Sequence, residues 1–202
     1  MSFFPDAEPL SSPRPQRSQT PSWIHPPLGE LAVPVAISGV LMRRPGVAVV
    51  LRRIDVYREG LSMSISVRAS RPVGMGDDEW ADLMEKMQPH RPFRRTQTET
   101  PLRLGLEFED GSTVIANDRA HRFQFGSVPP DEPLLTLNGG GGGGSEDDYN
   151  LGMSGWLWPF PPKGPLRLIY DWAALQLPES SMTFSTDQLH SAREQVVNIW
   201  TD

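Results

Sequence analysis

Residues 61–70 alternate strictly between apolar and polar side chains. Because successive side chains of a β-strand point to opposite faces, this period of two predicts a strand with one buried face and one face in water. Residues 102–109 repeat the pattern, so the chain is expected to fold mainly as β-strands of this kind. The apolar positions of the two alternations are Leu61, Met63, Ile65, Val67, Leu102, Leu104, Leu106 and Phe108.

Two segments upstream, Val35–Arg43 and Val47–Tyr57, are rich in β-branched residues. Pro45-Gly46 separates them and is a favourable pair for a type II turn, and Glu59-Gly60 leads into residues 61–70. Three strands joined by short turns predict a three-stranded antiparallel meander. Further short strands are expected over residues 112–116, 134–137, 154–160, 165–172 and 182–184.

Two segments follow the period of a helix instead. Asp77–Met87 places Trp80, Leu83 and Met87 on one face, which predicts an amphipathic helix of about three turns. Asp187–Trp200 is expected to form a C-terminal helix. We therefore expect a mainly β fold: an antiparallel β-sandwich, in an immunoglobulin-like or open-barrel variant, with one inserted helix and one C-terminal helix.

Proline and glycine divide the chain. Residues 1–30 hold seven prolines, cannot bury enough apolar surface to offset their ordering entropy, and are expected to form a disordered tail. Residues 31–202 are expected to form a single domain with a helical insertion at residues 71–100. The six glycines Gly139–Gly144 have no side chains to pack, so residues 138–150 are expected to form a flexible loop.

The composition excludes several kinds of site. The chain of 202 residues has no cysteine, which excludes disulfide scaffolds, thiol nucleophiles and cysteine-ligated metals. Its first residues lack the basic and apolar segments of a secretory signal. No apolar run approaches the roughly 20 residues that a membrane-spanning helix needs. We expect a cytoplasmic protein with no membrane partner.

The net charge of −6 is unevenly distributed, because residues 35–72 carry seven arginines against two acidic residues. Such a basic region can meet phosphates, so nucleic-acid binding is one alternative. Arg52 and Arg53 are adjacent in an expected strand and should point to opposite faces. That geometry argues against one continuous basic patch and makes nucleic acid a disfavoured partner. The arginines of this alternative are Arg43, Arg44, Arg52, Arg53 and Arg58.

Two carboxylates provide an enzymatic alternative. Glu107 and Glu109 share one face of the strand expected at 102–109, where paired carboxylates could serve a hydrolase or lyase. The solvent-exposed face of a half-buried strand explains them more simply. We assign no catalytic residue, no metal ligand and no cofactor. No two of the four histidines have the spacing of a metal site, and the glycine run lacks the lysine of a phosphate-binding loop.

An aromatic cluster lies in the C-terminal third of the chain. On extended strands these side chains would share a face, either in the sandwich core or in a groove for an extended or proline-rich segment. The core is the simpler interpretation, while residues 5–27 supply a proline-rich segment that could occupy such a groove. The candidate ligand-binding residues are Trp156, Trp158, Phe160, Tyr170 and Trp172.

The glycine tract, Trp158-Pro159-Phe160-Pro161-Pro162, Gly164-Pro165-Leu166 and residues 104–111 together carry a resemblance. They resemble a family of uncharacterised actinobacterial proteins of about this size. In that family a glycine run precedes a Trp-Pro-Leu-Pro-Pro-like segment and a Gly-Pro-Leu strand, and Phe160 stands here in place of the leucine. The resemblance implies a bacterial protein in which the glycine run is native, and it implies no activity.

Taken together, the patterns favour a non-catalytic interaction module that binds a protein partner. The absence of any residue set with catalytic or metal-binding spacing supports this interpretation, as do segments rich in proline and glycine, which are compatible with partner binding. The hydrolase or lyase and the nucleic-acid-binding protein remain as alternatives.

Overall fold

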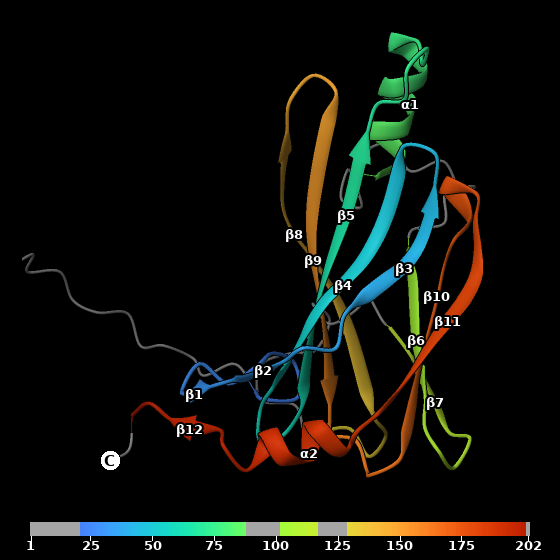
Figure 1. Ribbon diagram of the computed structural model, residues 1–202. Helices are drawn as coiled ribbons and strands as arrows, with labels where there is room; N and C mark the ends of the chain where they lie inside the picture. The colour runs from blue at the N-terminus through green and yellow to red at the C-terminus, as the bar shows by residue number, and fades with distance from the viewer. Residues whose placement is uncertain (1–20, 88–101, 117–128, 201–202) are drawn as a thin grey trace, which may run out of the picture.

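The computed structural model describes residues 21–87, 102–116 and 129–200 (Figure 1). These residues form a larger and a smaller antiparallel sheet that pack face to face, a separate two-stranded sheet and two α-helices, and the predicted mainly β sandwich is confirmed. Residues 1–20 of the expected tail and residues 88–100 of the expected insertion lie outside the described residues, as do His90 and His121.

The larger sheet has six strands, and β5 lies at its centre. It pairs along its whole length with β4 on one side and with β9 on the other, so the predicted meander is confirmed. The strand order is β2-β4-β5-β9-β8. Strand β3 also pairs with β4, along residues 47–51, on the same edge that β2 occupies at residues 54–56. The strands are β2 (Val33–Val35), β3 (Gly39–Arg44), β4 (Val47–Val56), β5 (Leu61–Ser70), β8 (Leu134–Gly144) and β9 (Asp148–Trp158).

The smaller sheet has the order β11-β10-β6-β7. Its strands are β6 (Arg103–Glu107), β7 (Thr113–Ile115), β10 (Pro165–Trp172) and β11 (Leu177–Ser185), with the 3-10 helix η2 (Ala173–Leu175) between the last two. Strand β3 lies beside β11, and β7 lies beside β8. The edges of the two sheets thus approach each other on both sides, which favours the open-barrel variant of the sandwich.

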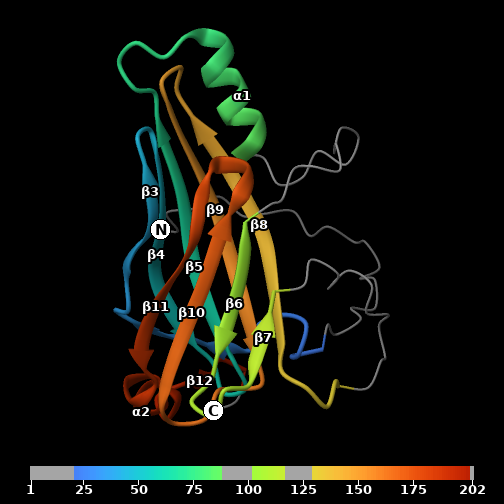
Figure 2. The same cartoon turned by 90° about the vertical axis from the view of Figure 1, so that its right-hand side faces the viewer.

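The core lies between the sheets and follows the alternation in the sequence. The apolar positions of β4, β5 and β9 face those of β6 and β10, and most are less than 5% exposed. The helices α1 (Asp77–Met87) and α2 (Asp187–Arg193) add apolar side chains to this core. Figure 2 shows them at opposite ends of the sandwich, with α1 beside the β8–β9 hairpin.

The C-terminal helix is shorter than expected. It ends at Arg193, and the chain continues into β12 (Val197–Asn198), which pairs with β1 (Glu30–Leu31). The N–H of Ile199 also donates to the carbonyl of Gly29 at 2.8 Å. The segment after Arg193 contains Val196, Val197 and Ile199, and β-branched residues lose side-chain freedom in a helix and favour strands. The prediction of a helix up to Trp200 is therefore wrong for its last turns.

The glycine tract is not the loop that was expected over residues 138–150. Gly139–Gly144 continue β8, a short turn follows at residues 145–147, and β9 begins at Asp148. The backbone of the glycines pairs with β9, with one irregularity between Gly139 and Gly142. Ladder hydrogen bonds need no side chains, so residues that have nothing to pack can still extend a strand.

The alternating burial of side chains along β5 can be tested directly. Ile65 is 1% exposed in the core, whereas its neighbour Ser64 points to the opposite face of β5. Ile65→Ala should lower the free energy of unfolding by about 2–5 kcal/mol, and Ser64→Ala should change it by less than about 0.5 kcal/mol. Urea unfolding followed by far-UV circular dichroism measures both, and equal effects would contradict the assigned faces.

Candidate functional site

Tyr170 and Trp172, two of the candidate ligand-binding residues, belong to the core. They lie on β10, are 4% and 2% exposed, and pack among the apolar side chains between the sheets. They are not available to a ligand in this structure, so the core interpretation is correct for these two residues.

Trp156 and Trp158 point to the outer face of the larger sheet, because the odd-numbered residues of β9 face the core. Trp156 is nevertheless only 1% exposed. Its Nε1 donates to the carbonyl oxygen of Ser22 at 3.0 Å, and the ring of Tyr57 lies edge-on with its centroid 5.4 Å away. Burial raises the pKa of the Tyr57 hydroxyl, with a smaller contribution from nearby carboxylates.

Phe160 lies in a third environment, different from those of the other four aromatic candidates. Strand β9 ends at Trp158, so Phe160 leaves the alternation and packs near α2. Its ring lies 5.0 Å from that of His190 and 4.6 Å from the guanidinium carbon of Arg193. The five aromatic candidates therefore lie in three separate environments, and the expectation that they share one groove is wrong.

The described end of the tail packs over Trp156 in an unexpected conformation. The N–H of Ile24 donates to the carbonyl of Pro21 at 3.1 Å, which closes a turn instead of an extended polyproline segment. Ile24 is 5% exposed, and the Ser22 hydroxyl donates to Glu59 at 2.5 Å. These contacts make residues 21–25 an anchor of the chain on the outer face.

Glu107 is the last residue of β6 in the smaller sheet, and Glu109 lies in the turn that follows, so the expectation that the two carboxylates share one strand face is wrong. Arg167 on the neighbouring β10 donates to Glu107 at 2.8 Å, which is a surface ion pair of small energetic weight. The structure adds nothing that favours acid–base chemistry at these two carboxylates.

Strand β4 contains a β-bulge at Arg52. Leu51 is opposite Ile65 and Arg53 is opposite Ser64, so Arg52 is an extra residue without a partner on β5. Leu51 and Ile54 are both fully buried, and Arg52 and Arg53 are both exposed on the outer face. The expectation that Arg52 and Arg53 point to opposite faces is wrong, because a bulge places two successive residues where a regular strand places one.

A row of paired residues crosses the outer face of the larger sheet. Arg43 pairs with Ala48, Ala48 with Arg68, Arg68 with Asn150, and Asn150 with Gly143. The row runs through β3, β4, β5, β9 and β8 in that order. It places Arg43 at one end, Arg68 in the middle and a bare glycine backbone at the other end.

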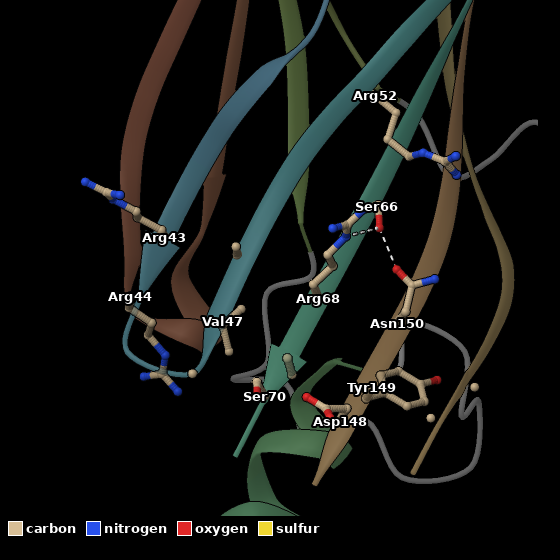
Figure 3. A pocket seen from close by; sticks show the side chains of 15 residues that line it. Arg43, Arg44, Val47, Arg52, Ser66, Arg68, Ser70, Asp148, Tyr149 and Asn150 are labelled. Atoms are coloured by element: carbon tan, nitrogen blue, oxygen red, sulfur yellow. Dashed lines mark hydrogen bonds between the residues drawn. The ribbon is translucent and has the colours of Figure 1, made fainter. Parts of the chain in front are cut away.

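A shallow hollow of about 880 Å³ lies over this row (Figure 3). We call it the arginine hollow. The small residue Ala48 lies between Arg43 and Arg68 on the outer face, and the Ser66 hydroxyl donates to the Asn150 side-chain oxygen at 2.5 Å. Its polar and charged lining residues are Arg43, Arg44, Arg52, Arg68, Ser66, Ser70, Asp148, Tyr149 and Asn150.

The four arginines of the hollow make no ion pair with any described residue. The described ion pairs of arginine use Arg53, Arg71, Arg103 and Arg167 instead. The Nε of Arg44 is buried, and the described residues offer it no acceptor. A buried donor without an acceptor is costly, and a carboxylate or phosphate oxygen is the acceptor that a guanidinium prefers.

Two arginines of the sequence prediction lie elsewhere. Arg53 pairs with Asp55 at 2.8 Å, and Arg58 donates to the carbonyl of Val196 at 3.1 Å. Arg68 takes part in the hollow although it was not among the candidates. The alternation of residues 61–70 already placed it on the outer face, but only the register of β4 against β5 brings it beside Ala48 and Arg43.

A second hollow, of about 650 Å³, lies beside α2. Arg58, Lys163, His190 and Arg193 line it together with Asp187 and Glu194, so its charges are mixed. The Nε2 of His190 is buried without a partner among the described residues. This balance of charge gives no preference for one class of ligand.

No protein-family model, curated protein or solved structure matches this chain, so the resemblance drawn from the sequence gains no support from these comparisons. The described residues contain no cluster of side chains that could hold a metal ion. Within the same residues, no helix is long and apolar enough to cross a membrane.

The anchor over Trp156 generates a prediction. Removing residues 1–28 exposes the Trp156 ring and removes Ile24 from its buried site. We expect a red shift of tryptophan fluorescence and a loss of about 1–3 kcal/mol in the free energy of unfolding. Removing residues 1–20 alone is the matched control, because these residues do not include the anchor. A shift of equal size in both truncations would contradict the assigned contacts.

Proposed function

We propose that the protein is a non-catalytic interaction module that binds an acidic segment of a partner protein in the arginine hollow. One observation carries the proposal: Arg43, Arg44, Arg52 and Arg68 all line one open hollow, and none has an ion-pair partner among the described residues. The binding surface thus differs from the aromatic groove considered from the sequence.

The clustering of these arginines is unfavourable without a ligand. Arg43 and Arg68 lie two strands apart on either side of Ala48, about 10 Å by strand spacing, so their like charges repel each other weakly. Carboxylates would remove the repulsion and give charge-assisted hydrogen bonds, which contribute about 1.5–3 kcal/mol each. A chain with a net charge of −6 that still concentrates arginine at one place gains most from an anionic partner.

A protein partner accounts for the hollow better than nucleic acid does. Proteins that bind single strands combine basic residues with aromatic platforms for the bases. Tyr149 is the aromatic residue that lines the hollow, and it is partly buried against the core. Arg53 and Arg58, which would extend the basic surface, have hydrogen-bond partners of their own outside the hollow.

Fluorescence anisotropy with labelled peptides tests the proposal. The acidic probe is an eight-residue Glu-Ser repeat and the neutral probe is a Gly-Ser repeat of equal length. We expect the wild-type protein to bind the acidic probe more tightly, and Arg52→Ala or Arg68→Ala to weaken binding at least about tenfold. Raising the salt concentration should weaken the binding of the acidic probe to the wild-type protein, because the hollow is open to solvent.

Arg53→Ala is the matched control, since it removes the adjacent arginine of the same strand, which pairs with Asp55 and lies outside the hollow. It should change the affinity less than about twofold. Equal binding of both peptides would contradict the proposal. Tighter binding of single-stranded oligothymidylate than of the acidic peptide would also contradict it and would favour a nucleic-acid partner.

A further inference from the structure

The glycines at the end of β8 do not all have a steric reason to be glycine. A Cβ at Gly140 would lie 2.8 Å from the carbonyl oxygen of Gly152, and a Cβ at Gly144 would collide with the carbonyl of Asp148. At Gly141 and Gly143, by contrast, no described atom lies within 4 Å of the Cβ position, and neither residue has a positive φ.

Glycine inside a strand weakens it, because it loses the most backbone entropy and has no side chain to pack. A glycine that the protein's own packing does not require often marks a place where a ligand or another backbone comes close. Gly143 lines the arginine hollow and pairs with Asn150 on its outer face, whereas Gly141 does not line it. The two positions are alike in leaving open space for a Cβ, but Gly143 is paired with β9 at the hollow, whereas Gly141 lies in the irregularity of β8 between Gly139 and Gly142.

The row from Arg43 to Gly143 is too long for a single anionic group. It crosses five neighbouring strands, and strands lie about 4.8 Å apart, so its ends are about 19 Å from each other. An extended polypeptide at about 3.3 Å per residue covers that distance with about six residues. A lone carboxylate or phosphate would reach one end only.

The charge of the hollow changes along the row. The arginines come from β3, β4 and β5, whereas β9 contributes the exposed Asp148, two residues from Asn150. Glu146 and Asp147 precede Asp148 in the adjoining turn. A uniformly negative chain would be attracted at the first end and repelled at the second. A polypeptide can instead carry carboxylates at one end and neutral or basic residues at the other.

We propose that the bound acidic segment crosses the strands of the larger sheet, with its carboxylates at Arg43, Arg52 and Arg68 and its backbone against Gly143 and Gly144. This inference rests on the proposed function and adds the length, direction and charge polarity of the ligand. It also gives part of the glycine tract a role, because a side chain at residue 143 would occupy the space of the peptide.

Gly143→Val tests this contact, with Gly141→Val as the matched control. Both variants should fold, because no described atom lies within 4 Å of the Cβ position at either residue and valine favours strands. The probe is a labelled peptide of four glutamates and four serines, made in both orders. We expect Gly143→Val to weaken binding at least about tenfold and Gly141→Val to leave it within about twofold.

The two levels of the proposal can fail separately. If Arg68→Ala weakens binding and Gly143→Val does not, the ligand does not reach the glycines, and this inference is overturned while the proposed function stands. If Arg52→Ala and Arg68→Ala both bind like the wild type, the proposed function itself is overturned. If Gly141→Val weakens binding as much as Gly143→Val, the effect is not specific to the hollow and the inference is overturned.

A charge reversal tests the polarity. Two further peptides keep the four glutamates and end in two lysines or in two more glutamates. The wild type should prefer the lysine peptide, because Asp148 and its neighbours face that end, and Asp148→Lys should reverse the preference. A preference that does not respond to Asp148→Lys would overturn the assigned direction.

Discussion

The pairing of β5 with two neighbours organises the rest of the molecule. All ten of its residues are in register with β9, and its ends are in register with the ends of β4, so the alternation of β5 is imposed on both strands. Its apolar side chains all face the second sheet and are buried there. Because a shift of one residue would turn every side chain to the wrong face, the buried face also determines the register. The outer face, where the arginine hollow lies, is therefore positioned by the core.

A single inserted residue changes that outer face. The bulge at Arg52 keeps Leu51 and Ile54 in the core and leaves two successive arginines in solvent. Arg53 then pairs with Asp55, while Arg52 lines the hollow. Bulges disrupt a ladder locally and re-aim side chains, which is why they occur beside binding sites. In this protein the bulge separates an arginine that is structurally paired from one that is available to a ligand.

The candidate site was visible in the sequence only in part. The excess of arginine over residues 35–72 pointed to Arg43, Arg44 and Arg52, which do line the hollow. Arg68 was missed because its neighbours come from β4 and β9, and its closeness to them depends on cross-strand register. The aromatic candidates were misleading because residues two apart share a face only while the strand continues. The sequence could not say that β9 ends before Phe160, nor that its tryptophans and the aromatic residues of β10 face different sides.

The alternation and turn residues by themselves determined the mainly β class, the meander from β3 to β5 and the bounds of α1, because these depend on the local period of two or 3.6 residues. Tertiary structure decided the rest. Pairing with β9 made strand from the glycine tract, and pairing with β1 ended the C-terminal helix early. The row from Arg43 to Gly143 joins residues that are 100 positions apart in the chain. Such a row exists only where hydrogen bonds bring distant strands into register, and no local pattern of residues encodes that contact.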